Sequence, residues 1–176
     1  MTSPFVAPDL NAPRLSHIVS SPIGRLLLLG DGHALTGLWM LDADRHSWRV
    51  EEGLTPSPAT FREVGAQLEA YFAGEAKEFT VPLAPSGTPF QLSVWTELTK
   101  IPYGSTVSYG DIARALGKRL VASRAVGLAN GANPISVIVP CHRVIGSDGS
   151  LTGYGGGLER KELLLRLEGA SQARLW

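Results

Sequence analysis

The chain has 176 residues, of which 44% are hydrophobic and 18% charged, and its formal net charge is zero at pH 7. This composition predicts a globular protein of one or two small domains with a sizeable core. The longest apolar run near the N-terminus, residues 26–29, is too short for a membrane span or a signal peptide. A single cysteine, Cys141, excludes an internal disulfide and a cysteine-built zinc site. We therefore expect a cytoplasmic protein that binds no membrane.

Residues 1–14 contain three prolines and show no periodicity, which predicts a flexible tail. Three short apolar runs follow, separated by the turn sequences Ser-Pro-Ile-Gly and Gly-Asp-Gly, and predict an antiparallel meander. The runs cover residues 15–20, 25–29 and 34–41. Residues 42–59 are polar and rich in Pro and Gly, so we expect a loop there.

A helix is predicted next, because apolar residues recur at helical spacing over residues 61–72. Thr60 and Glu63 have the spacing of a capping box at its start, and Gly74 is expected to end it. The Pro- and Gly-rich stretch at residues 84–89 is the best linker candidate. It divides the chain into two domains, residues 15–85 and 88–176.

Charge is unevenly distributed along the chain. Residues 1–97 carry six basic and eleven acidic side chains, whereas residues 98–143 carry six basic side chains and one acidic one, Asp111. Residues 144–176 are balanced, with four of each. One basic segment in a neutral protein suggests a local footprint for a polyanion. A solvated helix face would produce the same pattern, so charge alone leaves both interpretations open.

The basic segment also has the pattern of a helix-turn-helix. Residues 111–116 and 123–130 predict two short helices joined by a turn that contains Gly117. The second helix is rich in small residues, and Arg124 is its one long polar side chain. A reader of the major groove normally presents several long polar side chains, so this helix fits a narrow groove better. Tight helix packing would select small residues equally well.

The segment Ile-Val-Pro-Cys-His-Arg-Val, residues 138–144, carries the one cysteine. It follows an apolar run, residues 135–139, that predicts a buried strand ending at Pro140. The thiol of Cys141 would then leave the core, and His142 beside it can take its proton to form a nucleophilic thiolate. Neighbouring residues of an extended chain face opposite ways, so a sharp bend is needed. A lone cysteine is more often an inert, buried small hydrophobe.

A glycine-rich stretch, Gly-Tyr-Gly-Gly-Gly at residues 153–157, precedes the last predicted helix. A phosphate cradle is one interpretation, but the residues that accompany such loops are missing, and a loop that closes on a flat ligand also needs glycine. Residues 158–167 predict an amphipathic helix whose apolar face includes Leu163, Leu164 and Leu167. Glu168 lies at its end, where a carboxylate is usually just solvated, and Gly169 is expected to stop it.

Taken together, Asn-Pro at 133–134, the stretch 140–146 and the glycine-rich stretch resemble the signature of the O6-alkylguanine-DNA alkyltransferases, also called methylated-DNA–protein-cysteine methyltransferases. The resemblance covers residues 88–169 closely and residues 15–80 loosely. It implies an α+β fold with a small N-terminal α/β domain containing an antiparallel sheet. The C-terminal domain should be a mostly helical winged helix-turn-helix. Some relatives carry zinc in the N-terminal domain, but this chain has no zinc constellation there, so we expect neither metal nor cofactor.

The resemblance also implies a reaction. An alkyl group on O6 of guanine, and on O4 of thymine, would pass irreversibly from a base flipped out of duplex DNA to Cys141. Each molecule would act once, because a thioether does not hydrolyse. His142 takes the thiol proton through a bridging water, and Glu168 orients the histidine. Tyr109 assists the leaving guanine, and Asn133 braces the segment that carries the cysteine.

The same resemblance implies how DNA is held. The second helix of the helix-turn-helix lies in the minor groove, and its arginine fills the space left by the flipped nucleotide. The DNA-binding residues are then Arg124, Ala122, Ser123, Gly127 and Ser108. The backbone of Val144, Tyr154 and Gly155 forms the base pocket. The expected partner is double-stranded DNA containing alkylated bases, bound by a monomer that can cluster on the DNA.

Two other classes of protein fit parts of the sequence. A cysteine hydrolase using Cys141 and His142 would turn over repeatedly and ignore DNA. A non-catalytic DNA-binding regulator or lesion sensor would bind DNA equally well after Cys141→Ala and would transfer no alkyl group. The presence of the cysteine argues against this second class.

Overall fold

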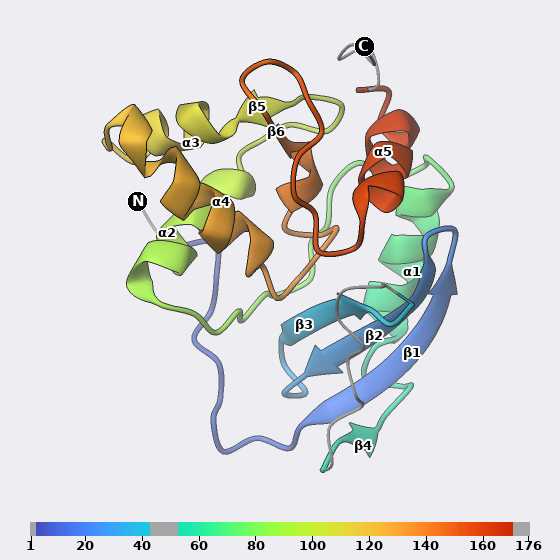
Figure 1. Ribbon diagram of the computed structural model, residues 1–176. Coiled ribbons are helices and arrows are strands. Elements are labelled where there is room, and N and C mark those ends of the chain that lie inside the picture. Colours follow the sequence, from blue (N-terminus) through green and yellow to red (C-terminus); the bar gives the residue numbers. More distant parts are fainter. Residues whose placement is uncertain (1–2, 43–52, 171–176) are drawn as a thin grey trace. The chain divides into compact units, whose positions relative to one another are not determined.

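The computed structural model describes residues 3–42 and 53–170. The chain folds into two compact units, and the expected α+β class is confirmed (Figure 1). Unit 1 contains residues 1–86 and 134–138, and unit 2 contains residues 87–133 and 139–176. The short stretch 134–138 thus belongs to unit 1 although it lies far along the chain, a feature that the predicted linker at residues 84–89 does not indicate.

Unit 1 is built on a four-stranded sheet with the strand order β3-β2-β1-β4 (Figure 1). Its strands are β1 (Leu15–Ser21), β2 (Gly24–Gly30), β3 (Leu35–Met40) and β4 (Thr55–Pro56). The first three pair antiparallel and confirm the predicted meander. The two-residue strand β4 pairs parallel to β1 inside the segment predicted as a loop. Residues 43–52 of that segment lie outside the described residues.

The helix of unit 1, α1 (Arg62–Phe72), confirms the helical spacing but not the predicted capping box. No side chain caps its first turn. Thr60 instead lies in a turn, where its hydroxyl pairs with that of Ser57 at 2.7 Å, and the helix begins two residues later. Val64, Leu68 and Tyr71 form the buried face of the helix.

Two further segments of unit 1 differ from simple expectations. The N–H of Val6, in the predicted tail, donates to the Leu83 carbonyl at 2.9 Å; residues 1–2 lie outside the described residues. The predicted strand at 135–139 is wrong: Ile135 forms a single bridge to Leu38, and the next three residues turn, with Val137 at φ 71°. The run is buried, as predicted, because a short apolar run indicates burial and does not by itself distinguish a strand from other buried structure.

Unit 2 is mostly helical. Its regular elements are α2 (Pro89–Leu98), β5 (Val107–Ser108), α3 (Tyr109–Ala115), η1 (Leu120–Ala122), α4 (Ser123–Gly131), η2 (Cys141–Arg143), β6 (Val144–Ile145) and α5 (Leu158–Leu167). Helices α3 and α4 confirm the helix-turn-helix, and β5 pairs parallel with β6 (Figure 1). Gly117 ends α3 at φ 66°, a left-handed conformation that favours glycine.

Capping boxes start α2 and α3, formed by Thr88 with Gln91 and by Ser108 with Asp111. The indole Nε1 of Trp95 in α2 donates to the Ala129 carbonyl of α4 at 2.8 Å and fixes these two helices against each other. Within the described part of the chain, no helix has the length and apolar character needed to cross a bilayer.

Candidate active site

Cys141 begins the short helix η2, so the backbone turns tightly at this residue. The Cys141 N–H donates to the Val139 carbonyl at 2.8 Å, and the Arg143 N–H donates to the Pro140 carbonyl at 3.0 Å. Cys141 is only 4% exposed, so the expectation that its thiol leaves the core is wrong. Burial raises the pKa of the Cys141 thiol, while the Asn133 side chain and the Lys161 charge act in the opposite direction. The resting side chain is therefore a protonated thiol at neutral pH.

His142, the next residue, is fully buried and faces Glu168. Its Nε2 lies 2.8 Å from Oε1 of Glu168. Burial lowers the pKa of His142 and outweighs the opposing effect of Glu168, so the ring is neutral at pH 7. A neutral ring that donates from Nε2 to the carboxylate carries its lone pair on Nδ1. That Nδ1 is buried and has no hydrogen-bond partner among the described residues, which leaves it available to accept a proton.

Glu168 is held from several sides by groups far away in the sequence. Arg143 donates to it twice, from Nε to Oε2 at 2.8 Å and from Nη2 to Oε1 at 2.9 Å. The Gly104 N–H donates to Oε2 at 3.2 Å. A Cβ on Gly104 would lie 2.8 Å from the Glu168 carbonyl oxygen, so this approach requires glycine. Four hydrogen bonds, counting that from His142, hold the carboxylate ionised and fix its orientation.

Arg143 is not predicted for this cluster from the sequence, where it belongs to the basic segment of the polyanion footprint. The structure corrects this: Arg143 is buried, and its Nη1 donates to the Ile101 carbonyl at 2.6 Å. Its guanidinium also lies over the Tyr103 ring, 5.8 Å from the centroid. A sequence signal existed, since a buried glutamate needs a cation, and an arginine directly follows the histidine.

Lys161 is a second residue of this region that sequence patterns do not predict. It is buried on α5, and its Nζ donates to the Val144 carbonyl at 2.7 Å and the Thr152 carbonyl at 2.8 Å. Burial lowers the pKa of Lys161 to about 8, against the effect of the nearby Cys141. The ammonium thus ties one predicted base-pocket carbonyl to the loop that precedes α5.

The buried face of α5 explains how Lys161 and Glu168 both reach this region. Lys161, Leu164, Leu165 and Glu168 are buried and follow the i, i+3, i+4, i+7 spacing of one helix face. The predicted apolar face is partly wrong, because Leu163 is exposed. The bounds of the helix are as predicted, and Gly169 follows it at φ 73°.

Two asparagines anchor the cysteine turn. Asn133, predicted to brace this segment, donates from Nδ2 to the Val139 carbonyl at 2.8 Å. Asn130, which sequence patterns do not predict for this site, donates from Nδ2 to the Cys141 carbonyl at 3.3 Å. Both are buried, and Asn130 belongs to α4. The C-terminal end of α4 is therefore hydrogen-bonded directly to the backbone of the cysteine.

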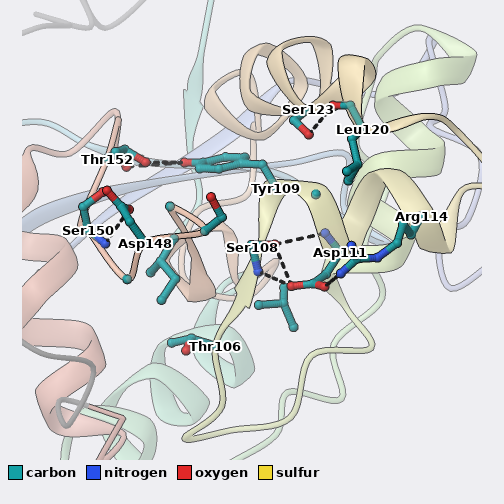
Figure 2. Close-up of a pocket in the computed structure, with 16 residues that line it drawn as sticks. Thr106, Ser108, Tyr109, Asp111, Arg114, Leu120, Ser123, Asp148, Ser150 and Thr152 are labelled. Atoms are coloured by element: carbon teal, nitrogen blue, oxygen red, sulfur yellow. Dashed lines mark hydrogen bonds and ion pairs between the residues drawn. The ribbon is translucent and has the colours of Figure 1, made fainter.

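An open pocket of about 950 Å³ lies beside the N-terminus of α3, and Figure 2 shows its walls. Three predicted site residues line it: Ser108, Tyr109 and Ser123. The Tyr109 hydroxyl points toward the Thr152 carbonyl at 3.4 Å (Figure 2). Ser108 uses its hydroxyl to cap α3 by bonding to Asp111. Cys141, His142 and Glu168 do not line this pocket, so Tyr109 lies on its wall while the buried cluster lies elsewhere in unit 2.

The predicted DNA-binding and base-pocket residues differ in how exposed they are. Arg124 is exposed on α4, Ala122 and Ser123 are half-buried at its start, and a Cβ on Gly127 would meet the Tyr109 ring at 3.8 Å. Val144 and Tyr154 are buried, and Gly155 is exposed. In the described part of the chain, Arg124 forms no ion pair, and no group of three or more His, Cys, Asp and Glu side chains could hold a metal ion.

Comparison with known proteins places the chain in a family. Residues 89–170 match the family model of the 6-O-methylguanine DNA methyltransferase DNA-binding domain. Residues 15–85 match that of the 6-O-methylguanine DNA methyltransferase ribonuclease-like domain.

Relatives agree over most of the chain. A methylated-DNA–protein-cysteine methyltransferase of Methanosarcina acetivorans is 54% identical over 87% of this chain and 97% of its own. One from Mycobacterium tuberculosis is 55% identical over 85% of this chain and 89% of its own. The crystal structure of Mycobacterium tuberculosis OGT in complex with DNA has a TM-score of 0.82 and 52% identity, covering 89% of this chain and 94% of that one. The chain, with its buried Cys141, His142 and Glu168, therefore belongs to the methylated-DNA–protein-cysteine methyltransferase family.

Proposed function

We propose that this protein repairs DNA directly by transferring a methyl or larger alkyl group from O6 of guanine in duplex DNA to the sulfur of Cys141. The observation that carries the proposal is the placement of the one cysteine beside a neutral, buried histidine that is hydrogen-bonded to a carboxylate. This arrangement can generate a thiolate at the moment of reaction, following the logic of a catalytic triad.

In the proposed reaction, the Cys141 proton passes to Nδ1 of His142 through a bridging water. The sulfur attacks the alkyl carbon, so that an S–C bond forms as the C–O6 bond breaks, and the bonding electrons leave with the guanine. Tyr109 supplies a hydrogen bond or proton to the leaving base. The imidazolium formed at His142 is stabilised by Glu168, which Arg143 keeps ionised. The product is a thioether that water does not cleave, so each molecule acts once.

DNA handling is assigned to the helix-turn-helix. Arg124 projects from α4 without an ion pair in the described structure, and Lys118 and Arg119 precede it on the exposed turn. Small residues on α4 allow close approach to a minor groove, and Arg124 occupies the space of the flipped nucleotide.

The flipped base is assigned to a pocket formed by the backbone of Val144, Tyr154 and Gly155, and Asn133 braces the segment that carries Cys141. We extend the substrate to O4-alkylthymine, whose alkyl group is also attached to an exocyclic oxygen of the base. The protein works as a monomer in the cytoplasm, where a reducing environment keeps the thiol free. Its two domains span residues 15–85 and 88–176, with the chemistry in the second.

Intact mass spectrometry tests this proposal. Incubation with a duplex containing O6-methylguanine should add one methyl group to the protein, on Cys141, and repair should stop at one equivalent. Continued turnover by unmodified protein would favour a cysteine hydrolase. Tight DNA binding without any mass increase, unchanged by Cys141→Ala, would favour a non-catalytic regulator.

A further inference from the structure

The outward face of α4 has an unusual composition for an exposed helix. Its exposed positions include Val121, just before the helix, and then Arg124, Ala125 and Leu128, which follow the i, i+3, i+4, i+7 spacing of one face. Val121 is 85% exposed and Leu128 is 72% exposed. The outer face of a solvated helix is normally polar. Here Arg124 is the only charged side chain, and it lies between two large apolar ones.

The surroundings of this face indicate its partner. Leu120 is also exposed, at 59%, so three of the eight exposed large hydrophobic residues in the described part of the chain lie within nine positions. The flanking exposed side chains are basic, at Lys118 and Arg119. An apolar strip bordered by cations complements a polyanion with an apolar interior. Duplex DNA is such a partner, since phosphates border its grooves and stacked bases lie between them.

We infer that Leu128 is a second side chain that α4 inserts into DNA, where it serves as an apolar wedge beside Arg124. This inference rests on the DNA repair function proposed above. Residues four apart lie about 6 Å apart along a helix axis, which exceeds the rise of about 3.4 Å per base pair. Leu128 therefore meets a base step next to the one that Arg124 occupies. Leucine is one of the apolar residues that unstack base steps in minor-groove complexes.

The two side chains then have different tasks. Arg124 occupies the gap left by the flipped nucleotide, whereas Leu128 holds open the neighbouring step and lowers the cost of unstacking. Val121 lies one turn before Arg124, on the side of Arg124 away from Leu128, and contacts the wall of the groove. Leu128 is thus a specificity-determining DNA contact for duplex substrates and has no part in the reaction with a free base.

The experiment compares Leu128→Ala with Leu163→Ala, a control that shortens an exposed leucine of α5. The duplex carries O6-methylguanine next to 2-aminopurine, whose fluorescence rises on unstacking, and accommodates one protein molecule. The second substrate is the free base O6-benzylguanine. Leu128→Ala should slow methyl transfer from the duplex about tenfold, as expected for lost apolar burial, and weaken the fluorescence rise. Its rate with O6-benzylguanine and its Tm should equal those of the wild type. Leu128→Met should restore the duplex rate, and Leu163→Ala should behave as the wild type.

Each other outcome overturns the inference. An unchanged duplex rate for Leu128→Ala would show that Leu128 is not a wedge. An equal loss of rate on both substrates would indicate a structural role for Leu128. Loss of cooperative binding to long DNA with a normal rate on the short duplex would assign this face to a second copy of the protein. These outcomes are separate from failure of the proposed function, in which the wild type itself would gain no methyl group from either DNA or free base.

Discussion

The guanidinium of Arg143 and the carboxylate of Glu168 are joined by two parallel hydrogen bonds of 2.8 and 2.9 Å in the interior of unit 2. The same carboxylate contacts Nε2 of His142 at 2.8 Å. Glu168 therefore serves two partners, a permanent cation and a ring that becomes a cation only when it accepts a proton. The positive charge of Arg143 also contributes to lowering the pKa of His142, after the larger effect of burial. This balance keeps the ring neutral and ready to accept a proton.

Replacing Arg143 by methionine should destabilise the protein strongly. Removing one partner of a buried ion pair leaves an uncompensated charge, which typically costs about 3–5 kcal/mol. The matched control is Arg114→Met, which removes an exposed arginine paired with Asp111 and should cost less than about 1 kcal/mol. Urea denaturation at pH 7 measures both free energies of unfolding. Similar small losses for the two variants would show that Glu168 does not depend on Arg143.

Lys161 should make the free energy of unfolding depend on pH. Its pKa is lowered from 10.5 to about 8, so between these values the unfolded chain binds a proton that the native protein does not. Stability attributable to Lys161 therefore rises with pH across this window and is lost as pH falls through about 8. The expected gain is on the order of 3 kcal/mol.

The measurement is best made without the thiol, because burial raises the pKa of Cys141 and makes stability fall with pH above the pKa of the unfolded thiol. Denaturation of Cys141→Ala and of the double variant Cys141→Ala, Lys161→Met is followed from pH 7.5 to 10.5. As the pH rises over this range, the free energy of unfolding of Cys141→Ala should increase relative to that of the double variant. Parallel pH profiles would contradict the lowered pKa of Lys161.

Arg124→Ala should separate DNA handling from chemistry. Flipping a base costs a few kcal/mol, so loss of the inserted side chain should slow repair of duplex DNA by about one to two orders of magnitude. Reaction with free O6-benzylguanine should change little, because a free base needs no flipping. Cys141→Ala should abolish both reactions and leave DNA affinity largely intact. Rates for the two substrates are compared at unchanged Tm, and an equal loss on both would refute the flipping role of Arg124.

DNA affinity should fall steeply with salt, with a log–log slope of roughly −0.9 for each phosphate neutralised. Lys118→Ala and Arg119→Ala should each make the slope less steep by about 0.9. Lys100→Ala is the matched control, because Lys100 is paired with Glu97 on the protein surface, and it should leave the slope unchanged. Fluorescence anisotropy between about 50 and 200 mM salt provides the slopes. Binding that is independent of salt would rule out this basic footprint.

Local patterns in the sequence predicted many elements of unit 2, and the resemblance carried by a short motif predicted the chemistry. The motif around Cys141 indicated the nucleophile, its histidine and the family, and helical spacing placed α5 at its observed bounds, residues 158–167. The meander of unit 1 was predictable because turn residues and alternating apolar runs are local features. Each of these inferences depends on residues that are neighbours along the chain.

Tertiary structure alone decided which other side chains join the buried cluster. Arg143 lies 25 positions from Glu168, and Lys161 lies 17 positions from the Val144 carbonyl that it binds. Their charges could equally have faced solvent, and in sequence Arg143 counted toward a DNA footprint. The apolar run 135–139 similarly determined burial but not backbone shape, because the core accepts any segment whose polar groups find partners. Long-range hydrogen bonds, which no local pattern encodes, placed Arg143 and Lys161 in the buried cluster.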